Sequence, residues 1–124
     1  MDLLNTPMIN TLSRALDLTA LRQRLVSENI ANIDTPGYQT RDIDFAAELK
    51  RAVSEDSTGE DASALPVAVH TLPGLEQRPD GNNVSIDRES LLMAQNQLQF
   101  QTSVAVLRTE LNRLQLAING GSNS

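Results

Sequence analysis

The chain has 124 residues and a formal net charge of −6, with 40% hydrophobic residues, no cysteine and no tryptophan. This length predicts one domain at most, and the negative charge disfavours nucleic acid or an anionic membrane surface as a partner. Two phenylalanines and one tyrosine are the only aromatic residues, so any core is aliphatic, and no thiol or disulfide chemistry is available.

The N-terminal stretch does not have the pattern of a signal peptide. Asp2 stands where a signal peptide has basic residues, and no apolar segment of the required kind follows. No stretch of the chain approaches the apolar length that crosses a bilayer. We therefore expect no membrane insertion, and we expect any export to proceed without a cleavable Sec-type signal.

An amphipathic pattern predicts a first long helix over residues 8–33. Pro7 suits its first turn, and Thr6 or Asn5 suits the cap. At ~1.5 Å per residue this helix is about 39 Å long. Its apolar surface is broader than a two-stranded coiled coil needs, because two lines of residues adjoin. They are Ile9, Leu12, Leu16, Val26, Ile30 and Ile33, and Leu18, Leu21 and Leu25.

The first helix ends in two asparagines followed by a Pro-Gly turn. Asn29 and Asn32 are one helical turn apart, so their amides are placed to bond freed carbonyls or a neighbouring chain. Pro36 ends the helix, and Gly37 permits the positive φ that a type II turn requires.

The segment after this turn predicts a short helix and then a long connection. Three acidic residues lie among basic ones at the start of this helix, which predicts that they form a solvated face. They are Asp42, Asp44 and Glu48. Residues 55–61 are acidic and small, which predicts a mobile loop. Residues 65–72 predict a short strand that Pro66 keeps at a sheet edge. Residues 79–83 predict a turn.

A second long helix is predicted over residues 88–118, about 46 Å at ~1.5 Å per residue. Asp87 suits its N-cap, and Asn119 with the glycines after it suits its end. The two long apolar stripes are expected to pack on each other, and the surplus apolar width is expected to meet other copies. The stripe on this helix has unbroken steps of four and three: Phe100, Val104, Leu107, Leu111, Leu114 and Ile118.

No set of residues supports catalysis, a metal or a cofactor. His70 is the only histidine, and without cysteine a zinc site is disfavoured, so we expect it at the surface of an edge strand. The turn at Asp80 lacks the acidic twelfth residue of a calcium loop, since Leu91 stands there. No phosphate-binding glycine loop and no nucleophile elbow are present. We predict a protein that is not an enzyme.

The chain resembles the axial proteins that build the bacterial flagellar rod and hook. Their motif Asn-Ile-Ala-Asn-x-x-Thr-Pro-Gly-Tyr follows the first helix and is present here in full. Residues 39–45 and 80–89 resemble the same stretches of the proximal rod member. The motif is carried by Asn29, Ile30, Ala31, Asn32, Thr35, Pro36, Gly37 and Tyr38.

The resemblance implies a mainly α fold, in which two long terminal helices pack as an α-helical coiled-coil hairpin. We divide the chain into an N-terminal rod helix with its turn motif (1–50), a variable, partly disordered middle that holds a short β element (51–85), and a C-terminal coiled-coil helix (86–124).

The resemblance also implies a structural subunit of the proximal rod, the torque-transmitting drive shaft in the periplasm, exported by the flagellar type III system. Its implied partners are copies of itself, other rod proteins, the basal-body adaptor protein and the export gate. The alternative is a soluble helical adaptor or an export-chaperone-like module that holds a partner helix.

Two roles for the motif stay open: it locks adjacent subunits with Tyr38 as a buried anchor, or it caps its own helix. For Arg41, Asp42 and Asp44, ion pairing between subunits competes with plain solvation. The subunit-interface hypothesis comprises Asn29, Ile30, Asn32, Thr35, Pro36, Gly37, Tyr38, Arg41, Asp42, Phe45, Phe100, Val104, Leu107, Leu111, Leu114 and Ile118.

Overall fold

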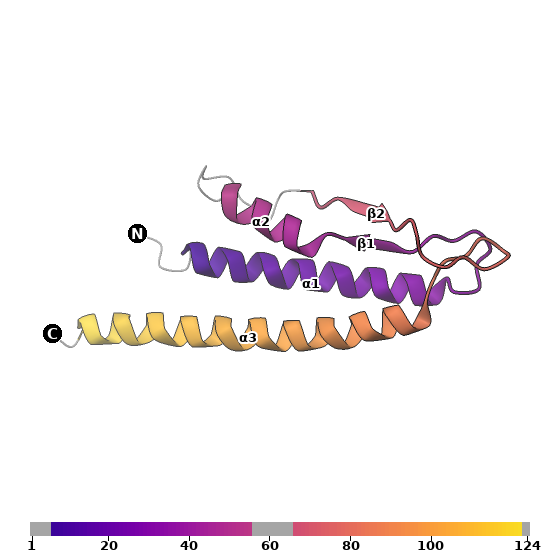
Figure 1. The fold of residues 1–124 in the computed structure, drawn as a ribbon. Coiled ribbons are helices and arrows are strands. Elements are labelled where there is room, and N and C mark those ends of the chain that lie inside the picture. Colours follow the sequence, from indigo (N-terminus) through magenta and orange to yellow (C-terminus); the bar gives the residue numbers. More distant parts are fainter. Residues whose placement is uncertain (1–5, 56–65, 123–124) are drawn as a thin grey trace.

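The computed structural model describes residues 6–55 and 66–122. The two long helices run antiparallel, side by side, which confirms the predicted mainly α hairpin (Figure 1). A small antiparallel sheet and a short helix complete the fold. The elements are α1 (Pro7–Ala31), β1 (Arg41–Ile43), α2 (Phe45–Glu55), β2 (Val69–Thr71) and α3 (Ile86–Ser122).

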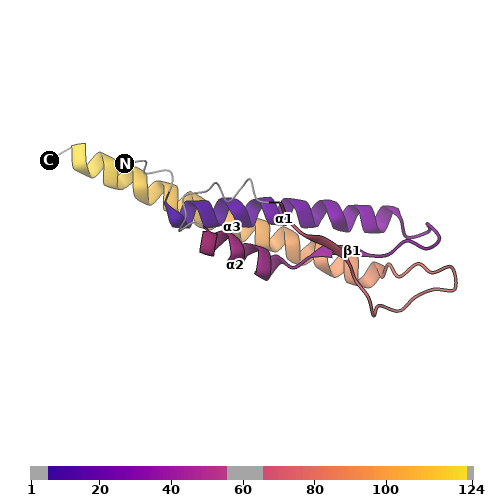
Figure 2. The same ribbon diagram turned by 90° about the horizontal axis from the view of Figure 1, so that it is seen from above.

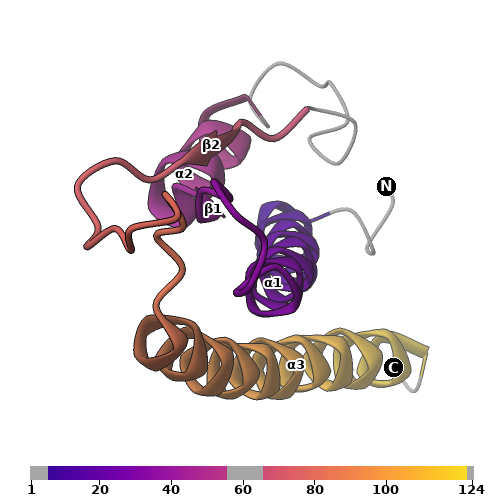
Figure 3. The ribbon, with the colours of Figure 1, turned by 90° about the vertical axis from the view of Figure 1, so that its right-hand side faces the viewer.

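Helix α1 is the middle layer of the molecule. Figure 3 shows α3 on one side of α1, and α2 with the two strands on the other. With 37 residues against 25, α3 is the longer helix, and its C-terminal end extends past the start of α1 (Figures 1 and 2).

The ends of α1 follow the predicted signals. The hydroxyl of Thr6 accepts a hydrogen bond from the backbone N–H of Ile9 at 3.2 Å, and Pro7 opens the helix. Asn32 leaves the helical conformation, so the helix ends at Ala31, two residues before the predicted end. In the following turn, the N–H of Tyr38 donates to the carbonyl of Thr35 at 3.2 Å.

The aliphatic core lies between α1 and the segment that carries β1 and α2. Leu18, Leu25 and Ile43 are its buried centre, and Phe45 and Leu49 are among the residues packed against it. The two long helices pack on each other, as expected, and α1 also buries apolar residues against the short elements, which the sequence did not predict.

The residues that α3 buries most deeply are polar. Glu89, Asn96 and Glu110 are 0%, 4% and 8% exposed, and seven or fourteen positions separate them, so they lie along one line of the helix. Asn96 donates a hydrogen bond from Nδ2 to the carbonyl of Thr19 on α1 at 2.9 Å. The predicted apolar stripe lies beside this polar line rather than on it.

The sheet joins the segment after the motif to the predicted edge strand. β1 pairs antiparallel with β2, with Asp42 opposite His70 and Ile43 opposite Val69. The strand expected over residues 65–72 is confirmed for its last part, and His70 is exposed as expected. The sequence did not predict β1.

The short helix α2 begins after Asp44, whose side chain accepts a hydrogen bond from the N–H of Ala47 at 3.1 Å. The solvated acidic face expected here is wrong for two residues, because Asp42 is 4% and Glu48 is 7% exposed. Glu48 accepts hydrogen bonds from the Arg51 guanidinium at 2.6 Å and from the N–H of Ala68 at 3.3 Å. Both carboxylates are hydrogen-bonded within the fold rather than solvated, Asp42 by Arg22 of α1 and Arg88 of α3.

Helix α3 begins at Ile86, two residues earlier than predicted. The hydroxyl of Ser85 accepts from the N–H of Arg88 at 3.3 Å, so Ser85 is the cap and the prediction of Asp87 is wrong. Asp87 lies within the first turn, where its charge complements the helix dipole. The mobile loop expected over residues 55–61 lies outside the described residues, apart from the backbone of Glu55.

Candidate functional site

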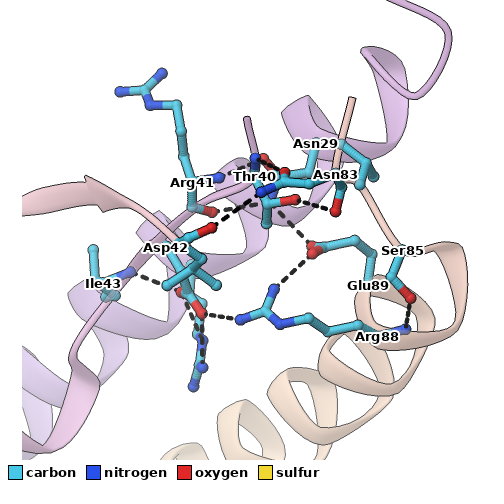
Figure 4. Close-up of polar contacts among 12 residues, drawn as sticks. Asn29, Thr40, Arg41, Asp42, Ile43, Asn83, Ser85, Arg88 and Glu89 are labelled. Atoms are coloured by element: carbon cyan, nitrogen blue, oxygen red, sulfur yellow. Dashed lines mark hydrogen bonds and ion pairs between the residues drawn. The ribbon is translucent and has the colours of Figure 1, made fainter. Parts of the chain in front are cut away.

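A cluster of charged and amide side chains joins α1, β1 and α3 near the closed end of the hairpin. We call it the polar junction: Arg22 and Asn29 from α1, Asp42 from β1, and Arg88 and Glu89 from α3 (Figure 4). Two positive and two negative charges balance within it, which is the condition under which ionised groups tolerate burial.

Asp42 receives four hydrogen bonds. Arg22 donates from Nε to Oδ1 and from Nη2 to Oδ2, both at 3.1 Å, and Arg88 donates from Nη2 to Oδ2 at 2.7 Å. The N–H of Ile43 donates to Oδ1 at 2.7 Å. Burial raises the pKa of the Asp42 carboxyl, but these hydrogen bonds outweigh it and the pKa lies below its usual value.

Arg88 connects the two buried carboxylates. Its Nη1 donates to Oε1 of Glu89 at 2.6 Å while its Nη2 holds Asp42 on β1 (Figure 4). Glu89 is fully buried and accepts a further hydrogen bond from Nδ2 of Asn29 at 3.1 Å. The start of α3 is thereby tied to both α1 and β1.

The Asn29 side chain pairs with the backbone of β1 in the way that a neighbouring strand would. Its Nδ2 donates to the carbonyl of Arg41 at 2.9 Å, and its Oδ1 accepts from the N–H of Arg41 at 3.0 Å. The hydroxyl of Tyr38 also donates to Oδ1, at 3.2 Å. Burial raises the pKa of Tyr38.

Two turns lie against each other at the tip of the molecule. The N–H of Gly37 donates to the carbonyl of Asp80 at 2.9 Å, and both Gly37 and Gly81 have positive φ. A Cβ on Gly81 would lie 3.4 Å from the Cα of Gly37. Asn82, which is fully buried, donates from Nδ2 to the carbonyls of Asn32 at 2.9 Å and Thr35 at 2.8 Å. The Pro-Gly turn is therefore built against the second turn.

Asn83 holds the next part of the motif segment. Its Oδ1 accepts from the N–H of Thr40 at 2.6 Å, and its Nδ2 donates to the carbonyl of Leu72 at 3.0 Å. Sequence reasoning gave Asn82 and Asn83 no role. The sequence did contain a signal, because two adjacent amide residues lie between a turn and a helix. Amide side chains at such a place commonly hydrogen-bond to the backbone when they are buried.

The predicted motif residues divide between inward and outward positions. Asn29 is 1% exposed, and Asn32 donates from Nδ2 to the carbonyl of Glu28 at 2.8 Å. Ile30, Tyr38 and Phe45 are half-buried, whereas Thr35, Pro36, Gly37 and Arg41 are exposed. The inward contacts are those that the capping role of the motif requires. The role of the motif between subunits stays a prediction.

Helix α3 leaves many large apolar side chains in solvent. Of the predicted stripe, Phe100 (46%), Leu111 (39%) and Ile118 (53%) are exposed, and Val104, Leu107 and Leu114 are half-buried. We use the name exposed apolar surface of α3 for a set of eight side chains. They are Ile86, Leu91, Leu98, Phe100, Val106, Leu111, Leu116 and Ile118.

Within residues 6–55 and 66–122, no three His, Cys, Asp or Glu side chains are grouped to hold a metal ion. Over the same residues, no helix combines the length and apolar character needed to cross a membrane. The chemistry of the described residues is hydrogen bonding and ion pairing that fix a shape.

Known proteins similar to this chain share one description. A family model described as flagella basal body rod protein matches residues 9–39, most of α1 and the motif. The flagellar basal body rod protein FlgB of Salmonella typhimurium is 40% identical over 124 residues, covering 87% of this chain and 90% of that protein. FlgB of Escherichia coli K12 is 38% identical over 127 residues (87% and 90%), and FlgB of Cereibacter sphaeroides is 37% identical over 121 residues (87% and 91%).

Proposed function

The chain belongs to the FlgB family of flagellar basal-body rod proteins, and we propose that it meets its neighbours in the rod through the exposed apolar surface of α3. It is a structural subunit of the proximal rod rather than an enzyme, and it assembles with other rod components. Among the described residues, no other element exposes as many large apolar side chains.

The observation that supports this proposal is the set of large apolar side chains that α3 leaves in solvent. Its eight large exposed apolar side chains lie on several sides of one helix, while the core of the subunit is formed by other elements. Large apolar side chains that a monomer exposes in number mark an interaction site. Neighbouring subunits supply the burial that the isolated chain lacks.

Within this surface, Phe100, Leu111 and Ile118 are the predicted contacts that stand out from the subunit. Half-buried Val104, Leu107 and Leu114 would support them from below. At the other end of the molecule, exposed Thr35, Pro36 and Arg41 form the part of the motif that a neighbour can reach. The buried motif residues would act by holding this tip in shape.

The export route and the specific binding partners are part of the same proposal. The flagellar type III system would export the chain, and the subunit would assemble in the periplasm near the basal-body adaptor protein and the export gate. The absence of cysteine supports passage as an unfolded chain, since refolding then needs no disulfide formation. The adaptor or chaperone alternative has less support, because the similar proteins are rod subunits.

Swimming in soft agar tests the proposal, in a strain that lacks the gene and carries a plasmid copy. Ile118→Asp and Val53→Asp make the same change at side chains that are 53% and 51% exposed, on α3 and α2. We expect the Val53→Asp strain to swim and the Ile118→Asp strain to fail, with equal amounts of protein and equal helicity. Normal swimming of the Ile118→Asp strain would contradict the role of the α3 surface.

A further inference from the structure

An uncharged groove lies between α1 and α3, halfway along the hairpin. Its volume is about 420 Å³. Apolar Met93 and Phe100 line it together with Ala20, and the other lining residues are neutral: Thr19, Gln23, Asn96 and Gln97. A charged segment would lose its hydration in this groove without gaining a partner, so the groove favours a neutral, apolar occupant.

A buried acceptor in the groove is unpaired. Asn96 is 4% exposed, and its Nδ2 donates to the carbonyl of Thr19 at 2.9 Å and to Oε1 of Gln23 at 3.0 Å. Its Oδ1 has no donor. A buried acceptor without a donor is unfavourable, so an occupant whose amide N–H or hydroxyl reached this oxygen would be favoured.

The end of α3 has the chemistry that this groove accepts. Residues 114–122 contain no charged side chain, and amides of Gln115 and Asn119 flank the apolar ones. Leu111, Leu114 and Ile118 recur at steps of three and four, the spacing with which a helix places one apolar side in a groove. This end of α3 extends past the start of α1, where α1 does not cover it (Figures 1 and 2).

The end of α3 cannot fill the groove of its own subunit. Met93 and Phe100, which line the groove, and Ile118, which lies in the overhanging end, belong to one continuous helix, and a helix does not fold back on itself. Residues 100 and 118 are about 27 Å apart at ~1.5 Å per residue. An α3 end that fills the groove must therefore come from another copy of the chain.

We propose that the C-terminal end of α3 of a second copy docks in the α1–α3 groove. This inference rests on the proposed function and names the partner for one part of the α3 surface. The two surfaces are different parts of the chain, so each copy offers one groove and one helix end. Such a heterologous contact repeats without closing on itself and builds an open row of subunits.

Disulfide trapping tests this contact, since the chain has no cysteine of its own. Ala20→Cys marks the groove, and Gln115→Cys marks the helix end one turn from both Leu111 and Ile118; both positions are exposed. The two variants are expressed together in the deletion strain, basal bodies are isolated, and the sample is oxidised. We expect a band of twice the subunit mass in non-reducing gels, at least tenfold stronger than in either single strain.

Val53→Cys in place of Gln115→Cys is the matched control, since it is an exposed position outside the proposed contact. Equal bands from the two pairs, or no band from cells that swim, would overturn the inference and leave the proposed function standing. The proposed function itself would be contradicted by normal swimming of the Ile118→Asp strain, which is a separate outcome.

Discussion

Arg88 on α3 donates a hydrogen bond to Asp42 on β1 at 2.7 Å, although 46 positions separate the two residues in the chain. The same guanidinium also holds Glu89, which in turn accepts from Asn29. Charges and amides therefore join the elements of the hairpin at its closed end. This arrangement leaves the apolar side chains of α3 available to neighbouring subunits.

Arg88→Met is expected to lower the free energy of unfolding by about 3 kcal/mol, because removing one partner leaves buried carboxylates without compensation. Urea denaturation followed by circular dichroism measures the change. Arg24→Met is the control. Arg24 forms an exposed ion pair with Glu28 at the long distance of 3.8 Å, so its loss is expected to change the free energy of unfolding by less than about 0.5 kcal/mol. Equal effects of the two substitutions would show that the polar junction does not stabilise the subunit.

Asp42 gives a defined dependence of stability on pH. Its pKa in the folded chain lies below the unfolded value of about 3.9, so its contribution is fully present above that value and is lost as the pH falls through the folded pKa. The difference in unfolding free energy between wild type and Asp42→Asn is therefore expected to be constant from pH 7 to about pH 5, and to shrink below pH 4. A difference that stays unchanged down to pH 3 would argue against this ion pair.

Gly81→Ala is expected to destabilise the subunit by about 1–3 kcal/mol, because the residue has φ +87°, a backbone conformation that residues other than glycine rarely adopt, and its new Cβ would contact Gly37. Gly120→Ala is the matched substitution: Gly120 lies in α3 with open space around it, so alanine should be neutral or slightly stabilising. Thermal unfolding of the two variants compares them. The pairing of the two turns would be contradicted by a Gly81→Ala protein as stable as the Gly120→Ala protein.

Asn32→Ala separates the two roles of the motif. The variant loses the hydrogen bonds to the carbonyl of Glu28 and from the hydroxyl of Thr35, so capping predicts a loss of about 1 kcal/mol in the isolated subunit. Asn112→Ala, at an exposed position of α3, is the control. If Asn32→Ala leaves the stability of the isolated chain unchanged but lowers assembly, the motif acts between subunits instead.

Periodicity predicted the parts of the fold that depend on local sequence. The steps of three and four placed both long helices to within four residues of their observed ends, and Pro36 with Gly37 predicted the turn. The family motif also predicted the rod identity, and the matching family model covers the motif residues.

Long-range partners were not predictable in the same way. A periodic pattern shows which residues are apolar but not which element covers them, so the core between α1 and α2 was missed. Asp42 was expected in solvent because its ion partners lie 20 and 46 positions away, beyond the reach of any local pattern. Asn82 and Asn83 were missed for the same reason, since their backbone partners are formed only by the folded tip.

The most direct test of the central claim is the amount of this protein in basal bodies purified from the complemented deletion strain, measured by quantitative mass spectrometry. We expect wild-type and Val53→Asp subunits in equal amounts relative to other rod proteins, and Ile118→Asp subunits at least tenfold depleted although they fold. Equal incorporation of Ile118→Asp would contradict assembly through the exposed apolar surface of α3.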